Sequence, residues 1–198
     1  MSTIVIVRKN GAVAIGADTL WKDGSTMVRA THVVNHSKIL RVGDSLVAYT
    51  GTGAWESVLG RYFGRLKRPP DMTSVPKLFE VILRMRPVLK ERYGVNSGDG
   101  SGDFDSSQFQ LLVANPGGVF AVYHDRAVSE FSTFCAFGSG YQFALGAMHE
   151  AYRTMERPED IARAGLEAAA EFDEDTGLPA EVFRIELAQP ASEPGPSP

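Results

Sequence analysis

Short apolar runs in the first fifty residues predict buried strands. Residues 3–7 form a continuous run rich in β-branched side chains, a pattern typical of a strand buried on both faces. The Asn-Gly pair at positions 10 and 11 predicts a tight hairpin turn into a second apolar strand over residues 12–17. The same pattern predicts another pair of strands over residues 38–42 and 46–50.

The rest of the chain combines two helical pairs with further strands. Residues 54–66 place apolar side chains three and four positions apart, which gives a helix one apolar face. After the break at Pro69 and Pro70, the same spacing predicts a second helix that ends near Tyr93. The remaining elements are predicted as strands over residues 108–114, 119–123, 127–134 and 182–187, and as helices over residues 141–155 and 158–172.

The order of these elements predicts the fold class. Strands, helices, strands, helices and a final strand follow one another in segregated runs, which is typical of an α+β fold. Two packed sheets with a helix pair outside each of them, a four-layer αββα sandwich, would bury the apolar side of every element. We expect one such domain over residues 1–187, followed by a disordered tail rich in Pro, Ser and Ala over residues 188–198.

Composition narrows the class of protein. With 198 residues, of which 43% are hydrophobic and 22% charged, the chain has the profile of a folded domain. Its formal net charge of −4 argues against nucleic-acid binding, which needs a basic excess. We see no signal segment and no apolar stretch of about 18 residues, so no membrane span is expected. A single cysteine, Cys135, excludes an intramolecular disulfide and points to a reducing compartment, with the cytoplasm as the expected location.

The motifs give no reason to expect a cofactor or a metal. The glycines at positions 51 and 53 lack the third glycine of a dinucleotide-binding loop. Three aspartates between positions 99 and 105 lack the spacing of a calcium loop, and a solvated loop explains them better. Cys135 lies among apolar neighbours, which favours a buried, unreactive thiol over a nucleophile.

The amino terminus offers a different chemistry. If Met1 is removed, Ser2 carries a free α-amino group beside its hydroxyl. That amine has an ordinary pKa of about 7.7–8, so it can accept a proton near neutral pH. One residue would then supply both the nucleophile and the general base. Taken alone, Ser2 is equally well explained as the common small second residue of a chain.

Five short motifs, taken together, resemble those of a known family. They occur in order and at compatible spacing over nearly the whole chain, to about residue 187. The motifs are residues 2–11 with Ala14-Ile15-Gly16-Ala17-Asp18, then Lys38-Ile39-Leu40-Arg41, Ala48-Tyr49-Thr50-Gly51, Gly138-Ser139-Gly140 and Asp173-Glu174-Asp175-Thr176-Gly177. In this arrangement the chain resembles a proteasome β-type peptidase, closest to the bacterial HslV kind, within the N-terminal-nucleophile hydrolases. The resemblance implies the same αββα fold.

The resemblance implies roles for Ser2 and two charged residues. In the family, a mature N-terminal threonine is followed sixteen positions later by an aspartate, and Asp18 stands sixteen positions after Ser2. This spacing selects Ser2, and not Thr3, as the nucleophile. Lys38 matches the family's lysine, whose charge would disfavour protonation of the Ser2 amine and ease loss of the hydroxyl proton. Asp18 would keep Lys38 charged and in place, and the plain alternative for both is an ordinary surface charge.

Four further positions take their roles from the same resemblance. The N–H of Gly51 would bind the oxyanion of the reaction intermediate, or Gly51 is simply a turn glycine before a helix. Ser139 would bond the Ser2 amine or a bridging water, and it is equally suited to cap the third helix. Asp173 and Thr176 match the family's Asp-x-x-Ser-Gly motif near the site, with a solvated helix end as the alternative.

The implied function is that of a self-compartmentalising peptidase. Such subunits form double rings, here of 12 or 14 copies, that hydrolyse unfolded proteins or peptides and can work with an ATP-dependent unfoldase. Two alternatives stay open: an amidohydrolase for small amides in the same superfamily, and a catalytically silent ring subunit that keeps Met1. No membrane or nucleic-acid partner is expected.

Three departures from HslV indicate a divergent bacterial branch, such as the betaproteobacterial proteasome homologue. Ser2 replaces the usual threonine, Thr176 replaces the usual serine, and the segment between Asp18 and Lys38 is a few residues longer. The sequence does not determine the substrate preference. Position alone suggests as pocket residues Thr19, Leu20, Thr31 and Tyr49.

Overall fold

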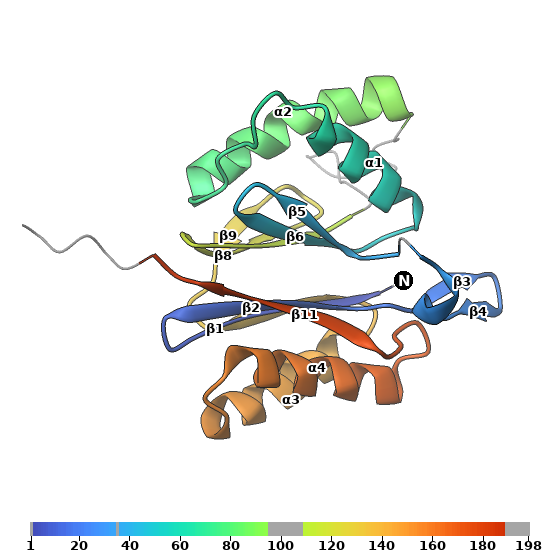
Figure 1. Cartoon of the computed structure of the whole chain (residues 1–198), viewed down its shortest axis with the longest axis vertical. Coiled ribbons are helices and arrows are strands. Elements are labelled where there is room, and N and C mark those ends of the chain that lie inside the picture. Colours follow the sequence, from blue (N-terminus) through green and yellow to red (C-terminus); the bar gives the residue numbers. More distant parts are fainter. Residues whose placement is uncertain (1, 35, 95–108, 189–198) are drawn as a thin grey trace, which may run out of the picture.

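The computed structural model describes residues 2–34, 36–94 and 109–188, which form four layers (Figure 1). Two β-sheets pack face to face in the centre; helices α1 and α2 cover the outer face of one sheet, and α3 and α4 cover the outer face of the other. The four helices run over Ala54–Gly64, Val75–Tyr93, Tyr141–Thr154 and Pro158–Phe172. The predicted α+β sandwich with an αββα order of layers is confirmed.

The first sheet has the antiparallel strand order β10-β1-β2-β11. The Asn-Gly turn predicted between β1 and β2 is present, with positive φ angles of 51° at Asn10 and 73° at Gly11, as a tight hairpin turn requires. The four strands run over Thr3–Lys9, Ala12–Asp18, Phe134–Gly138 and Ala180–Glu186 for β1, β2, β10 and β11.

The second sheet has the antiparallel order β5-β6-β7-β8-β9. Its strands run over Ile39–Val42, Ser45–Tyr49, Leu111–Asn115, Gly118–Val122 and Val128–Glu130. Each central strand touches the opposite sheet on one face and helices on the other, so its side chains are buried on both faces. This explains why β6, β7 and β8, like β1 and β2, are continuous apolar runs rather than alternating patterns.

Burial is divided among three apolar clusters, one between each pair of layers. The central cluster lies between the sheets and includes Ile4, Ile6 and Ile15 from the first sheet facing Leu112 and Ala121 from the second. The two outer clusters anchor the helices: one joins the second sheet to α1 and α2, and the other joins the first sheet to α3 and α4. The ends of the sheets are therefore fixed relative to each other, which matters for the site at one of those ends.

One predicted strand is wrong. The sequence predicts a single strand over residues 127–134, but the structure has β9 and β10, which belong to different sheets. Packed sheets lie about 10 Å apart, so one strand cannot pair in both. The chain crosses between them around Ser132 and Thr133, whose carbonyl accepts a hydrogen bond from the N–H of Arg8. Ser132 and Thr133, which stand between Phe131 and Phe134, are the polar pair at this break.

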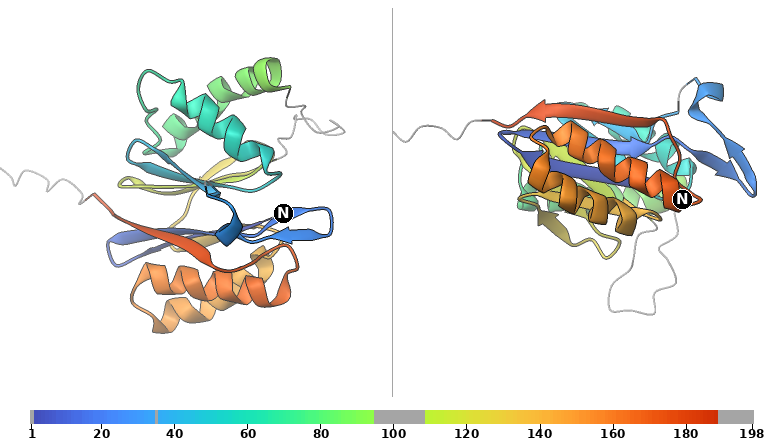
Figure 2. Two further views of the ribbon diagram at one scale, coloured as in Figure 1. Left: turned by 45° about the vertical axis from the view of Figure 1, so that its right-hand side comes forward. Right: turned by 90° about the horizontal axis from the view of Figure 1, so that it is seen from below.

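A second hairpin was not predicted. Strands β3 (Trp21–Asp23) and β4 (Thr26–Val28) pair with each other and project from the sandwich, as Figure 2 shows. A short 3-10 helix follows at Ala30–His32. These elements occupy the segment between Asp18 and Lys38. The Asp23-Gly24 pair was the sequence signal for the turn, and Gly24 adopts a positive φ of 58° there.

Two predictions fall largely outside the described residues. These are the solvated loop that holds the three aspartates between positions 99 and 105, and the tail over residues 188–198. Among the residues that the structure does describe, no helix is both long and apolar enough to cross a bilayer.

Candidate active site

Ser2 directly precedes β1, and the residues at the end of β10 hold it by its backbone. The carbonyl oxygen of Ser2 accepts a hydrogen bond from the N–H of Ser139 at 3.0 Å. Gly138, with φ of 104°, lies so close that a Cβ there would be 1.6 Å from the same oxygen. Only glycine permits this approach, so the Gly138-Ser139-Gly140 motif acts as a backbone clamp on Ser2. The side chain of Ser2 is itself largely buried.

Asp18 and Lys38 form a buried ion pair beside this residue. The Lys38 ammonium lies 2.7 Å from Asp18 Oδ1 and donates a second hydrogen bond of 2.7 Å to the carbonyl of Leu20. Asp18 is fully buried at the end of β2, and its carboxylate also accepts from the backbone N–H groups of Thr3, Leu20 and Gly177. Four donors therefore fix this carboxylate, and through it the lysine.

Burial sets the electrostatics of this pair. Desolvation lowers the pKa of Lys38 below the ordinary lysine value, although the charge of Asp18 opposes the shift. The ammonium is thus kept in place by its partner but is easier to deprotonate than an exposed lysine.

A second group of polar side chains lies on the other side of Ser2. Asp173 follows the last residue of α4, and its Oδ2 accepts hydrogen bonds from the hydroxyls of Ser139 at 2.7 Å and Thr176 at 2.5 Å. The Thr176 hydroxyl also lies 2.6 Å from the hydroxyl of Thr3, which accepts from the N–H of Gly140 at 3.0 Å. The structure therefore brings the predicted residues Ser139, Asp173 and Thr176 together. Thr3 joins them, and the sequence analysis did not assign it to the site.

Ser2 opens into a cavity of about 300 Å³. Of the other predicted residues, Lys38 and Gly51 line the same cavity. Gly51 has φ of 121° in the turn between β6 and α1, a conformation that side chains other than glycine rarely adopt. The complete lining is Ser2, Leu20, Trp21, Lys22, His36, Lys38, Tyr49, Gly51, Thr52 and Gly53.

The cavity wall was partly predicted. Leu20 and Tyr49 line it, as position suggested, but Thr19 and Thr31 do not. The hydroxyl of Thr19 instead bonds the carbonyl of Pro179. The β3–β4 hairpin adds Trp21 and Lys22, and these were missed because the hairpin itself was not predicted.

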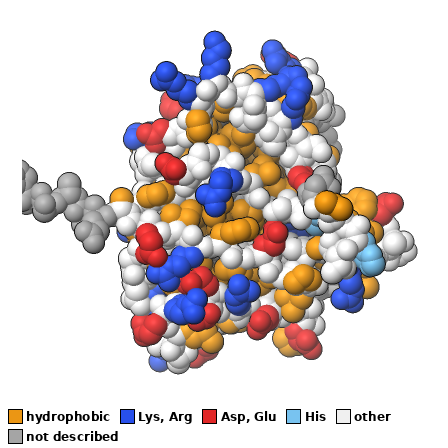
Figure 3. All heavy atoms as spheres, viewed as in Figure 1, with side chains coloured by type: hydrophobic (Ala, Val, Ile, Leu, Met, Phe, Trp, Pro, Cys, Tyr) orange, Lys and Arg blue, Asp and Glu red, His pale blue; other side chains and the backbone are white. Residues whose placement is uncertain are grey.

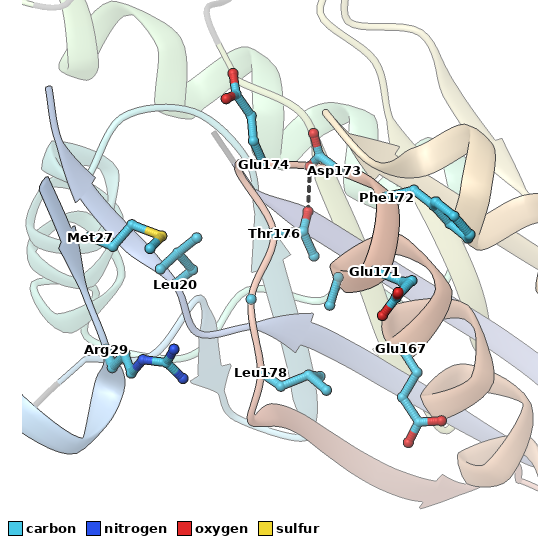
Figure 4. A pocket seen from close by; sticks show the side chains of 12 residues that line it. Leu20, Met27, Arg29, Glu167, Glu171, Phe172, Asp173, Glu174, Thr176 and Leu178 are labelled. Atoms are coloured by element: carbon cyan, nitrogen blue, oxygen red, sulfur yellow. Dashed lines mark hydrogen bonds between the residues drawn. The ribbon is translucent and has the colours of Figure 1, made fainter. Parts of the chain in front are cut away.

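A second, larger cavity of about 540 Å³ adjoins the first through Leu20 (Figure 4). It lies between the hairpin and the C-terminal end of α4, and Asp173 and Thr176 form part of its wall. Lys22 bridges hairpin and loop by an ion pair with Asp175 at 2.7 Å. The hydrogen bond from Lys22 lowers the pKa of Asp175.

Metal-ligating side chains do not gather in the described part of the chain. No three histidine, cysteine, aspartate or glutamate residues among those described are placed to hold a metal ion. The chemistry available at Ser2 is that of hydroxyls, an ammonium, carboxylates and backbone amides.

Comparison with known proteins places this geometry in a family. No family model and no curated protein matches the chain. Among solved structures, Thiobacillus denitrificans BPH is 46% identical, with a TM-score of 0.90 over 94% of this chain and 98% of that chain. Thiobacillus denitrificans BPH in complex with epoxomicin is also 46% identical, with a TM-score of 0.88 over 94% of this chain and 100% of that chain.

A more distant structure shares the fold. The eukaryotic HslV from Trypanosoma brucei is 18% identical, with a TM-score of 0.64 over 93% of this chain and 99% of that chain. The identity to BPH over nearly the full length of both chains is what decides the family. The chain belongs to the betaproteobacterial proteasome homologues, a branch with the proteasome-like fold of the N-terminal-nucleophile hydrolases.

Proposed function

We propose that this chain is the subunit of a self-compartmentalising peptidase in which Ser2, once Met1 has been removed, hydrolyses peptide bonds with its own amine as general base. The observation that carries the proposal is that Ser2 lines one cavity together with Lys38 and Gly51. Nucleophile, cation and a glycine turn thus face the same space. The relative from Thiobacillus denitrificans, solved in complex with epoxomicin, supports a site that accepts a peptide-like electrophile.

The reaction begins with the amine and hydroxyl of Ser2. The neutral amine takes the hydroxyl proton as Ser2 Oγ attacks the carbonyl carbon of the substrate, and the carbonyl oxygen becomes an oxyanion. The proton then passes from the amine to the departing nitrogen, which leaves an ester on Ser2 Oγ. A water molecule, deprotonated by the same amine, hydrolyses the ester and restores Ser2.

Two neighbours lower the barrier in this scheme. The Lys38 ammonium disfavours a second positive charge on the amine and stabilises negative charge on Oγ, and Asp18 holds that ammonium in place. The N–H of Gly51 donates to the oxyanion, a contact worth roughly 3–4 kcal/mol where single donors have been removed from other enzymes.

The experiment that tests this function begins with the intact mass of the purified protein. We expect loss of Met1, covalent addition of epoxomicin, and hydrolysis of fluorogenic peptides that the Ser2→Ala variant lacks. Met1-free protein that ignores epoxomicin, with a Ser2→Ala variant that loses no activity, contradicts the proposal. Retention of Met1 favours the silent ring subunit, and turnover of small amides without peptides favours the amidohydrolase.

We further propose that the subunits assemble into a double ring of 12 or 14 copies in the cytoplasm, with an ATP-dependent unfoldase as a partner for folded substrates. The helical layers carry exposed apolar side chains that suit subunit contacts. Figure 3 shows basic side chains along the top of the view, over α2. The exposed apolar residues of the helices are Phe79, Leu83, Tyr141, Phe143 and Phe172. Light scattering tests the assembly: a stable 21.5 kDa species at micromolar concentration contradicts it.

A further inference from the structure

Thr3 is a fully buried polar residue that the reaction scheme does not use. It follows Ser2 directly, and it is held at two points. Its N–H donates to Asp18 Oδ1 at 2.9 Å, and its hydroxyl lies between the N–H of Gly140 and the hydroxyl of Thr176. Thr3, the residue bonded to Ser2, thus contacts both Asp18 of the ion pair and Thr176 of the hydroxyl cluster around Asp173.

The direction of each hydrogen bond follows from counting protons. A hydroxyl has one proton to donate. The Thr176 proton goes to Asp173 Oδ2 at 2.5 Å, so at the 2.6 Å contact between the two threonines it must be Thr3 that donates. Thr3 in turn accepts from Gly140. The chain of bonds runs one way, from the Gly140 N–H through Thr3 and Thr176 to the carboxylate of Asp173.

This polarity extends to Ser139. Its hydroxyl proton also goes to Asp173 Oδ2, at 2.7 Å, so only its lone pairs remain for other partners. Ser139 adjoins Ser2, because its N–H donates to the Ser2 carbonyl. A serine in this state can accept a hydrogen bond from the Ser2 amine but cannot donate one, which suits an amine that must take up and hold a proton.

We propose that Thr3 is a positioning residue of the Ser2 site, and that its hydroxyl completes a one-way hydrogen-bond chain that fixes both the backbone of Ser2 and the orientation of Ser139. The inference rests on the proposed function of Ser2. Gly140 packs closely against this chain of bonds: a Cβ on Gly140 would lie 2.6 Å from Thr3 Oγ1 and 3.1 Å from Asp173 Cβ. The β-branch of threonine also restricts χ1, which holds the hydroxyl in its place.

The test compares Thr3→Ser with Thr3→Ala, two variants that differ only in the hydroxyl. In the assembled, Met1-free protein we expect Thr3→Ser to keep kcat for a fluorogenic peptide within about threefold of wild type. Thr3→Ala should lower kcat by about tenfold or more at nearly unchanged KM, because the substrate still binds while the reacting groups of Ser2 are misplaced. Thr3→Val, which keeps the shape and loses the hydroxyl, should resemble Thr3→Ala. Thr154→Ala is a control, because its hydroxyl bonds only a carbonyl of its own helix.

Several outcomes would contradict the positioning role of Thr3. Equal kcat values for Thr3→Ser and Thr3→Ala overturn the positioning role, and so does a loss that falls on KM alone. If Thr3→Ala and Thr3→Val fail to fold by circular dichroism while Thr3→Ser folds, the hydroxyl serves stability and the inference is wrong. A Met1-free wild type that neither turns over peptides nor binds epoxomicin overturns the proposed function, and this inference with it.

Discussion

Two groups of side chains meet at Ser2, and they are held together differently. Asp18 and Lys38 form an ion pair that is almost completely buried. On the other side, hydroxyls converge on Asp173, which is only partly buried at the end of α4. The first group provides a fixed charge at the cost of desolvating two ions. The second group orients the side chains around Ser2. Its hydrogen bonds between hydroxyls and a carboxylate are weaker than an ion pair, but they specify orientation. Disturbing the first should therefore have the larger effect.

The largest effect is expected from Asp18→Asn. An asparagine side chain offers one acceptor oxygen and one donor group, so it cannot accept from Lys38 and Thr3 on one side and from Leu20 and Gly177 on the other. Leaving the Lys38 ammonium buried without its partner should cost about 3–5 kcal/mol in the free energy of unfolding. Peptidase activity should fall by at least about a hundredfold. Urea unfolding and kcat/KM measure the two losses.

A matched control separates burial from the mere presence of an ion pair. The Lys77 ammonium nitrogen also lies 2.7 Å from a carboxylate oxygen, Asp71 Oδ2, but both side chains are about half exposed. Asp71→Asn should cost less than about 1 kcal/mol and leave activity unchanged. Equal losses from the two variants would show that burial of the Asp18–Lys38 pair is not what makes it important.

The next effect is a pH dependence that depends on Lys38. Its pKa is lowered by burial from the ordinary 10.5, so the proton is lost at a lower pH than in an exposed lysine. If the cation is what assists Ser2, kcat/KM should decline on the alkaline side before pH 10.5, and Lys38→Arg should move that decline upward. An alkaline increase in kcat/KM would instead make the neutral lysine the active form.

Stability should respond to the same group in the opposite direction. Between the folded-state pKa of Lys38 and 10.5, the unfolded chain binds more protons than the folded one, so this group's contribution to the free energy of unfolding rises with pH. Thermal unfolding of wild type and Lys38→Met across that range isolates the contribution. As the pH rises, kcat/KM should fall while the contribution of Lys38 to the free energy of unfolding rises. This combination is expected for a buried lysine and not for an exposed one.

Removing a side chain from the cluster of hydroxyls around Asp173 should have a smaller effect on activity and stability. Ser139→Ala removes one donor to Asp173 while the backbone N–H of residue 139 still holds Ser2. We expect kcat to fall by about tenfold and the free energy of unfolding by about 1 kcal/mol, the usual size of one hydrogen bond. The same kinetic and urea measurements apply. A loss as large as that of Asp18→Asn would contradict the ranking of the two groups.

The two groups also differ in how far the sequence could predict them. Asp18 and Lys38 are charged residues at the ends of apolar strands, where a charge is conspicuous, and the motif spacing identifies them. Thr3 sits inside a β-branched run and looks like any strand-forming residue, so its buried hydroxyl is recognised only when residues 140 and 176 are placed beside it. The local spacing of apolar residues predicted the helices and most strands. They could not show which sheet β10 joins, because that depends on pairing across the fold.

The smallest effect concerns Cys135, which lies in β10 three residues before Gly138, the glycine packed against Ser2. Burial raises the pKa of its thiol to about 11, so at pH 8 only about one molecule in a thousand carries the reactive thiolate. We expect iodoacetamide to leave the folded protein unmodified at pH 8 and to label it fully in urea, as intact mass will show. Cys135→Ala should keep epoxomicin binding unchanged. Loss of that adduct in Cys135→Ala, with retention in Ser2→Ala, would move the nucleophile from the amino terminus to the thiol, and neither of the two groups around Ser2 would then serve the reaction.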